Sequence, residues 1–370
     1  MNSINNEEKI EPYRILFPLG AFMGVIGVIF WFFFQTRWIG FFPRSAHGHL
    51  MFFGLLWSFV AGFLMTAIPK MTSTFSAQMW EISTAVILVF LQLILNIRNL
   101  TTISVVIFGL QNLLLLFFIL RRFIIHRKIP FFGFVFLPVA FIQSFVGIFI
   151  YFNTAFDKNI VLLFCGEAFV LNLILGLGSR LIPVISRLPN ALLPNEASKN
   201  DQWIWPLLTL FLINTGYWVE LIDGQKNLGL VLRSVGILIA SVKLFRLLKR
   251  PSTWSYSGVG LKIAISMLFI GQFLSLSFFG FYLAATHLMY IGGFTLMTFM
   301  IATRVMLAHG NQQLTYEVSS KRIIFVIAMF FLSALLRFVL GADVSSLLLS
   351  VSVLLFSLAI ITWSIKFLKT

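Results

Sequence analysis

Apolar runs of about 20 residues, each long enough to cross the hydrocarbon core as a helix, recur along the chain between short polar loops. The pattern predicts an all-α integral membrane protein with twelve transmembrane helices. The longest loop, 179–202, is too short and too rich in proline to form a domain of its own. The predicted spans are 15–34, 46–68, 81–97, 102–120, 131–152, 160–178, 203–222, 228–248, 258–277, 281–308, 323–340 and 345–367.

The composition supports this architecture and excludes a soluble domain. The chain is 59% hydrophobic and only 11% charged, with a mean hydropathy of +0.97. We therefore expect residues 1–370 to form a single polytopic transmembrane domain, with a short cytoplasmic tail at 1–14. Because this tail carries Glu7, Glu8 and Glu11 and no basic start, the first apolar run is predicted to be a retained span and not a signal peptide.

The basic residues are distributed unevenly between the two sides of the predicted bundle. Twelve spans place both termini on one side, and 20 of the 27 lysine and arginine residues fall on that side. The positive-inside rule therefore predicts cytoplasmic termini. The same distribution accounts for the net charge of +15, so we expect the partner to be the lipid bilayer and not nucleic acid.

Three of the five histidines stand at the beginning of apolar spans. His47 and His49 begin the second span, and the sequence His49-Leu50-Met51 is repeated at His287-Leu288-Met289, at the start of the tenth. Even-numbered spans run in the same direction, so these histidines lie at a similar depth near the outer surface. An ionisable group within a membrane span suggests function, and imidazole suits both haem iron and copper.

Two questions about these histidines stay open at the level of sequence. His47 and His49 are about 200° apart on an ideal helix, so a regular helix directs only one of them toward a given point. Each histidine could instead lie at the membrane interface and bond to a backbone carbonyl. Met51 and Met289 are auxiliary metal ligands in our interpretation, because thioether sulfur suits copper.

Polar residues also mark the inner ends of the sixth and tenth spans. Arg180 and Arg304 could hold a carboxylate, such as a haem propionate, although ordinary anchoring by positive charge explains them equally well. His309 is a further candidate metal ligand. It lies roughly 33 Å along the helix from His287, so the two cannot bind one ion.

The sixth span carries Glu167, a candidate proton carrier or partner of a ligating histidine, and Cys165, the only cysteine. The second, sixth and tenth spans, which hold the candidate residues, are four apart in order. Three arcs of four helices would bring these three spans together. No phosphate-binding loop, nucleotide fingerprint or cysteine-pair metal motif is present.

With these residues assembled, the sequence resembles the NnrS family of bacterial membrane proteins. The resemblance rests on the order and spacing of three blocks. They are His47-Gly48-His49-Leu50-Met51 with Gly54, Ala61 to Leu64 and Thr66 to Pro69; Ser179-Arg180-Leu181-Ile182-Pro183; and His287-Leu288-Met289 with Gly292, Leu296 to Thr298 and Arg304 to Gly310. Leu50 departs from the family's pattern, where this position is often acidic, and the second block has one arginine, Arg180, where a pair is usual.

The resemblance implies an inner-membrane protein that contains haem, of b type, and copper, and that acts in nitric oxide metabolism or in resistance to nitrosative stress. It also implies an electron donor. The layout looks like the catalytic subunit of haem–copper oxidases, in which histidines of the second and tenth spans hold a low-spin haem. His47 or His49 with His287 matches that arrangement.

The number of histidines limits this analogy. A full oxidase needs six histidine ligands, whereas only four lie in or beside spans here, so we do not predict an oxygen-reducing proton pump. Whether the protein is an enzyme stays open. The alternative function is a transporter or channel for a metal ion or small solute, with the outer histidines as the uptake site. Only Pro138 falls deep inside a span, which gives little sign of the broken helices typical of transporters.

Overall fold

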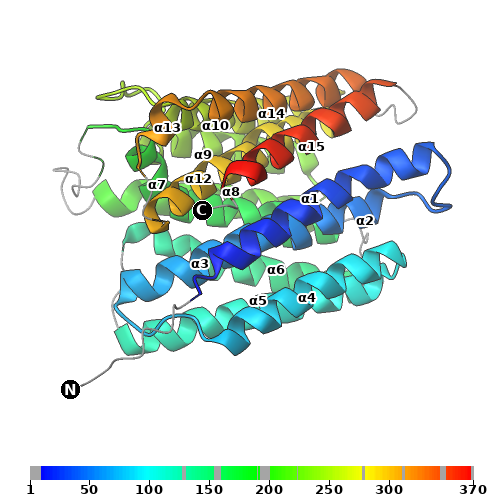
Figure 1. Ribbon diagram of the computed structural model, residues 1–370, viewed down its shortest axis with the longest axis horizontal. Helices are drawn as coiled ribbons and strands as arrows, with labels where there is room; N and C mark the ends of the chain where they lie inside the picture. The colour runs from blue at the N-terminus through cyan, green and yellow to red at the C-terminus, as the bar shows by residue number, and fades with distance from the viewer. Residues whose placement is uncertain are drawn as a thin grey trace.

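The computed structural model describes residues 10–126, 131–153, 160–189, 191, 201–222, 224–276, 280–310, 313–341 and 347–367. Over these residues the chain is helical, without strands, and the helices run nearly parallel along the long axis of the molecule (Figure 1). The link between the ninth and tenth predicted spans falls partly outside the described residues, as do part of the loop 179–202 and most of the tail 1–14.

Twelve helical rods correspond to the twelve predicted spans, with ends shifted by up to seven residues. The largest shift is at α7, which continues to Ile185, so the predicted loop 179–202 begins later than the sequence indicated. A short helix, α13 (Tyr316–Ser319), lies between the tenth and eleventh rods. The rods are α1 (Tyr13–Gln35), α2–η1–α3 (Arg44–His49, Leu50–Leu56, Trp57–Thr72), α4 (Met79–Ile97), α5 (Thr101–His126), η2–α6 (Phe132–Val135, Phe136–Phe152), η3–α7 (Leu162–Ala168, Phe169–Ile185), α8 (Asp201–Ile222), α9–η4 (Lys226–Ile239, Ala240–Leu244), α10 (Tyr256–Leu274), α11–η6–α12 (Tyr282–His287, Leu288–Thr295, Leu296–His309), α14 (Lys321–Leu340) and α15 (Leu347–Phe367).

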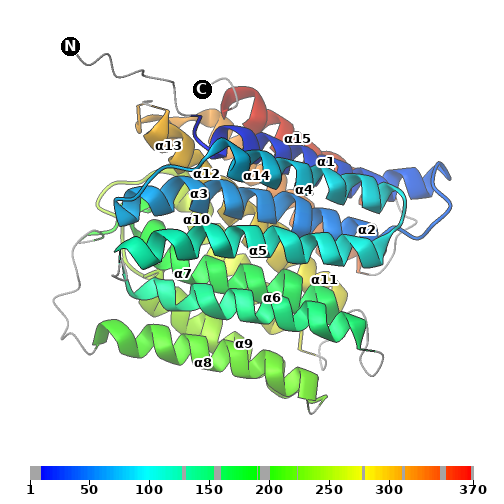
Figure 2. The same ribbon diagram turned by 90° about the horizontal axis from the view of Figure 1, so that it is seen from below.

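Eleven of the rods are long and apolar enough to cross a membrane, judged over the described residues. The remaining rod is α8, which has a sufficient length of 22 residues but carries Asn214, Glu220 and three tryptophans. It packs along α9 at one edge of the bundle, at the bottom of Figure 2. Its length and its place in the order of the rods correspond to the predicted seventh span, which stays a prediction.

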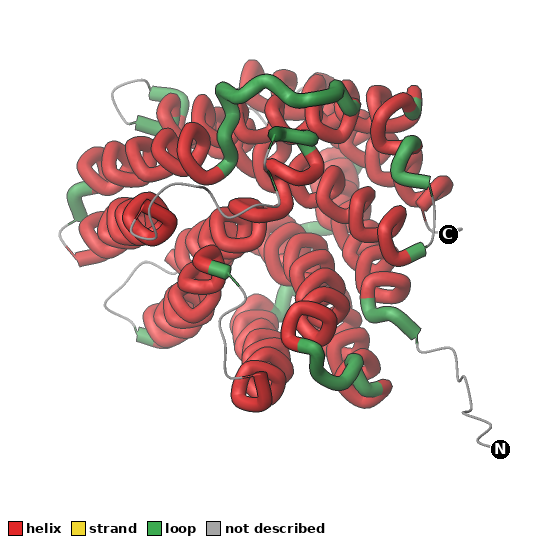
Figure 3. Tube along the Cα trace, turned by 90° about the vertical axis from the view of Figure 1, so that its left-hand side faces the viewer, coloured by secondary structure: helices red, strands yellow, loops and turns green. Residues whose placement is uncertain are grey.

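The rods form three arcs of four, each of which ends on one interior rod; one arc joins the last two rods of the chain to the first two. The helices α14, α15 and α1 pack in order against α2–η1–α3; α4, α5 and α6 lead to η3–α7; and α8, α9 and α10 lead to α11–η6–α12. The three interior rods, which we call the central spans, also contact one another pairwise. Figure 3 views the bundle nearly end-on, with the rods grouped around this interior. The packing confirms the expected grouping of the second, sixth and tenth spans.

The central spans are the most buried of the eleven. Their apolar windows are 89%, 83% and 72% buried, compared with 56% or less in the other eight. Any polar side chain on the inner face of a central span therefore faces protein and not lipid. This is the environment in which a membrane protein can hold a cofactor or an ionisable group.

Each central span also leaves α-helical geometry over one stretch: η1, η3 and η6 are π-helical. Short π-helical segments in α-helices occur often at functional sites. Gly166 within η3 permits the close approach of two central spans, because a Cβ at this position would lie 2.8 Å from the ring of Phe52 in η1. Phe52 is itself only 6% exposed, so its ring has little room to move away.

Replacing Gly166 with alanine tests this close contact. We expect Gly166→Ala to lower the free energy of unfolding by roughly 1–3 kcal/mol, because the added methyl overpacks the contact with Phe52. The measurement is the thermal unfolding midpoint in detergent. Gly109→Ala on α5 is the control, since its Cβ would meet no atom nearer than 3.4 Å. Equal midpoints for the two variants would contradict the close approach of η1 and η3.

Candidate functional site

The candidate histidines lie at the same end of the bundle, immediately before π-helical segments. His49 is the last residue of α2, and Leu50 begins η1; His287 is the last residue of α11, and Leu288 begins η6. The His-Leu-Met repeat in the sequence is therefore also a repeat in the structure. In both places the change of helical geometry follows directly after the histidine.

His47 and His287 have the same hydrogen-bonding arrangement. The Nδ1 atom of His47 lies 2.8 Å from the carbonyl oxygen of Gly27, and that of His287 lies 2.7 Å from the carbonyl oxygen of Leu283. A carbonyl only accepts, so each Nδ1 must carry the proton and donate it. This leaves the lone pair on Nε2, the arrangement that a metal-ligating histidine adopts. A carbonyl bond by itself also fits an interfacial histidine.

The structure brings His47 and His287 into electrostatic reach of one another. The guanidinium of Arg337, on α14, acts on both rings as well. Both histidines are partly buried, and the edge of the Trp31 ring lies against His47 at 5.8 Å between centroids. Of the two histidines in the second span, His47 is thus the one that resembles His287, in its carbonyl partner and its partial burial.

His49 belongs to a different environment, between α4 and α5. Its Nδ1 lies 3.0 Å from the hydroxyl of Ser104, which donates to Gln92 and accepts from Asn96. The ring is 2% exposed and stacks on Phe53. The cluster gives the histidine a hydrogen-bond partner within the protein, as expected for a structural role. In the sequence, this cluster was signalled by the amide side chains inside the third and fourth predicted spans.

Glu167 in η3 accepts hydrogen bonds from two tyrosines of different spans. The hydroxyl of Tyr217, on α8, donates to Oε1 at 2.9 Å, and that of Tyr290, in η6, donates to Oε2 at 2.6 Å. The carboxyl group is 2% exposed. The ring of Tyr290 also contacts His287, with 6.2 Å between centroids, and Phe52. A hydrogen-bonded chain thus leads from Glu167 to the neighbourhood of His287.

Two buried arginines lie at this end of the bundle, and sequence reasoning treated both only as charges that set topology. Arg233 on α9 is fully buried. Its Nη2 bonds Glu220 at 2.6 Å and its guanidinium covers the ring of Tyr217. Its Nε and Nη1 have no hydrogen-bond partner among the described residues. Arg337 is 6% exposed and bonds the carbonyl of Gly341. Both lie within predicted spans, which was the available signal.

The remaining candidate residues, two arginines and one histidine, lie at the opposite end of the bundle. Arg304 is paired with Glu317 of α13, and Arg180 lies over the ring of Phe131. His309 accepts from the ammonium group of Lys70, which also binds Glu11. Burial raises the pKa of Glu317, and the guanidinium groups of Arg304 and Arg187 oppose that rise. The inner arginines and His309 are therefore engaged far from the three outer histidines.

The sulfur ligands proposed from the sequence take different positions. Met51 lies against Gly27 of α1, the residue whose carbonyl accepts from His47. Met289 is buried against Gly271 of α10. Cys165 donates to the carbonyl of Ser144, as a buried structural thiol does. No group of three or more histidine, cysteine, aspartate or glutamate residues that could hold a metal occurs within the described part of the chain.

Comparison with known families and proteins adds two findings. The family model described as NnrS protein matches residues 10–370, nearly the whole chain. No curated protein matches the sequence closely enough to be counted as a relative.

Removing either tyrosine hydroxyl tests the hydrogen-bonded carboxyl group. We expect Tyr217→Phe and Tyr290→Phe each to cost about 1–3 kcal/mol of stability, because one oxygen of Glu167 is left buried without its donor. The measurement is again the unfolding midpoint in detergent. Tyr256→Phe, on α10 at the opposite end of the bundle, is the matched control. If all three variants unfold together with the wild type, the two tyrosines do not hold Glu167.

Proposed function

The chain belongs to the NnrS family, whose members are membrane proteins linked to nitric oxide, and on that premise we propose that it binds haem between His47 and His287. The haem would serve nitric oxide metabolism or resistance to nitrosative stress. The carrying observation is the matched pair of rings from the second and tenth spans. Each ring is fixed by a backbone carbonyl in the form with a free Nε2.

The chemistry of the surrounding side chains fits haem. Haem brings two carboxylates, which are best held by arginine. Arg337 acts on both candidate ligands, and Arg233 has two buried N–H groups that need an acceptor. In this proposal these two arginines are the better partners for the carboxylates. The assignment to Arg180 and Arg304 stays a prediction from sequence, and it would require the haem to reach the other end of the bundle.

Bound haem would supply an iron that exchanges single electrons, and the protein would position the haem and control protons. His47 and His287 would hold the haem, and their bonds to backbone carbonyls fix the two imidazoles. Tyr290 holds its proton between its own oxygen and Glu167, next to His287. Glu167 can therefore accept or return a proton through Tyr290 without exposure to lipid. Copper is a further proposal: Met51, one turn beyond His47 and against the same glycine, would be its soft ligand.

Optical spectra of the purified protein, oxidised and dithionite-reduced, test the haem proposal. We expect about one low-spin haem per chain in the wild type. We expect His47→Ala and His287→Ala to lose the reduced absorbance bands of the haem, because each removes a side chain that would hold it. His49→Ala and His309→Ala are the controls and should keep the haem.

Normal haem content in His287→Ala, with the fold intact by size-exclusion chromatography, would overturn the ligand assignment. A colourless wild-type protein from haem-replete cells would overturn the haem proposal. That outcome would favour the alternative, a transporter for a metal ion or small solute.

We also propose that the protein lies in the bacterial inner membrane with both termini in the cytoplasm. The support is the excess of lysine and arginine at the end of the bundle that holds the termini. A fluorescent protein fused after Thr370 should fluoresce, and alkaline phosphatase at the same position should be inactive. Active phosphatase with a dark fluorescent fusion would reverse the orientation.

A further inference from the structure

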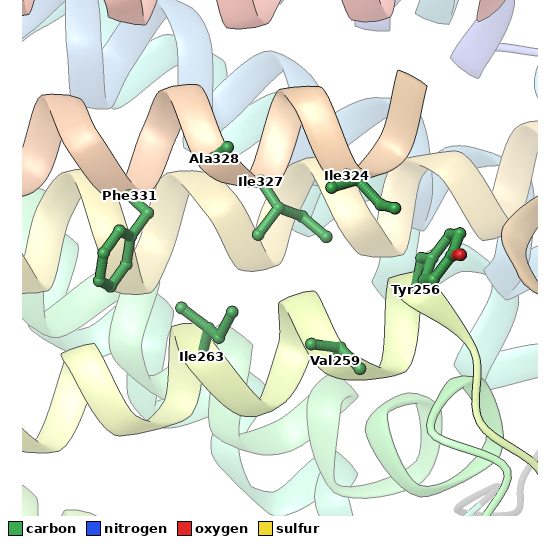
Figure 4. A pocket seen from close by; sticks show the side chains of 7 residues that line it. All are labelled: Tyr256, Val259, Ile263, Ile324, Ile327, Ala328 and Phe331. Atoms are coloured by element: carbon green, nitrogen blue, oxygen red, sulfur yellow. The ribbon is translucent and has the colours of Figure 1, made fainter. Parts of the chain in front are cut away.

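An apolar groove lies between α10 and α14, at the end of the bundle opposite the histidines. It has a volume of about 270 Å³ and is lined by Tyr256, Val259 and Ile263 of α10 and by Ile324, Ile327, Ala328 and Phe331 of α14. Figure 4 shows these side chains pointing into the space between the two helices. Apart from the Tyr256 hydroxyl, the lining is hydrocarbon. A groove of this kind on a membrane-spanning bundle accepts apolar chains.

The groove runs along the helices from the membrane surface toward the interior. Tyr256 and Ile324 lie at one end of it and Ile263 and Phe331 at the other (Figure 4). Tyr256 begins α10, so this end of the groove lies at the inner end of the helix. The seven-residue step from Tyr256 to Ile263 corresponds to a depth of about 10 Å. The groove is thus long and narrow, parallel to the membrane normal, as a lipid chain lies.

Basic residues surround the surface end of the groove. Lys321 precedes Ile324 by three residues, so it extends the groove-lining face of α14 by one turn. Lys321 and Arg322 are both exposed. Lys262, beside Ile263, directs its amine back to the carbonyl oxygen of Lys249 in the preceding loop. Positive charge therefore gathers where a lipid headgroup would lie, whereas the groove itself carries none.

We propose that this groove binds one anionic phospholipid, with an acyl chain between α10 and α14 and the phosphate against Lys321 and Arg322. Basic recesses between transmembrane helices are known to recognise anionic headgroups. The apolar lining would hold the acyl chain, and the two exposed basic residues would hold the phosphate of the headgroup. The site is independent of the proposed haem site, which lies at the other end of the bundle.

Native mass spectrometry of the detergent-purified protein, with defined phosphatidylglycerol or phosphatidylcholine added, tests the proposal. We expect one phosphatidylglycerol to stay bound to the wild type. The double variant Val259→Phe/Ala328→Phe should lose it, because the new rings fill the groove. Val106→Phe and Val235→Phe, at lipid-facing positions on α5 and α9, are the matched controls and should retain it.

A second pair of variants tests the headgroup contact. Lys321→Gln/Arg322→Gln should lower the preference for phosphatidylglycerol over phosphatidylcholine by about tenfold, because each basic residue near an anionic surface contributes several-fold. The control variant Arg37→Gln/Arg98→Gln removes the same charge at the opposite end of the bundle. It should leave the preference for phosphatidylglycerol over phosphatidylcholine unchanged.

Three results would overturn the proposal. They are a wild type that holds neither lipid, a wild type that holds both lipids equally, and a groove-filled variant that binds as the wild type does. A dimer in the wild type that Val259→Phe/Ala328→Phe dissociates would overturn it too, because a second copy would then cover the groove. A size-exclusion profile like that of the wild type shows that the groove-filled variant is folded.

Discussion

A carboxyl group inside a lipid-embedded bundle must find hydrogen-bond donors within the protein, and the arrangement of the interior depends on how Glu167 finds them. Tyr217 and Tyr290 donate to its two oxygens from the seventh and tenth spans. Without these bonds the buried carboxyl group would cost several kcal/mol. The sixth span is thus tied to the tenth at the depth of His287. The same contact places a proton-holding group beside the candidate haem ligand.

The local geometry of the central spans serves this junction. The π-helical segments η1, η3 and η6 contact one another at this junction. Gly166 allows η3 to approach the ring of Phe52 closely. Phe52 in turn packs edge-on against Tyr290. Glycine, phenylalanine and tyrosine from three distant stretches of sequence therefore form one packed unit. A change in the size of any one of these side chains would therefore disturb the packing of the other two.

The buried polar groups of the bundle are satisfied to different degrees. His49 bonds with Ser104, which bonds with Gln92 and Asn96, and in this cluster Asn96 Oδ1 alone lacks a partner among the described residues. Arg233 is a buried cation whose Nε and Nη1 both lack a partner among the described residues, close to Tyr217. A buried guanidinium with two unpartnered N–H groups calls for an acceptor such as a carboxylate.

The sequence by itself determined the spans, their order and the set of candidate residues, because apolar length and basic loops are local properties. The spacing of four also suggested, on the hypothesis of three four-helix arcs, that the second, sixth and tenth spans meet. The 200° between His47 and His49 also followed from the helical period. Only the tertiary structure decided their separate partners, the carbonyl of Gly27 for His47 and the hydroxyl of Ser104 for His49, because the rotation of a helix about its axis is set by packing. The partners of Glu167, at Tyr217 and Tyr290, and the position of Arg337 near the histidines likewise come from distant spans, which no local pattern encodes.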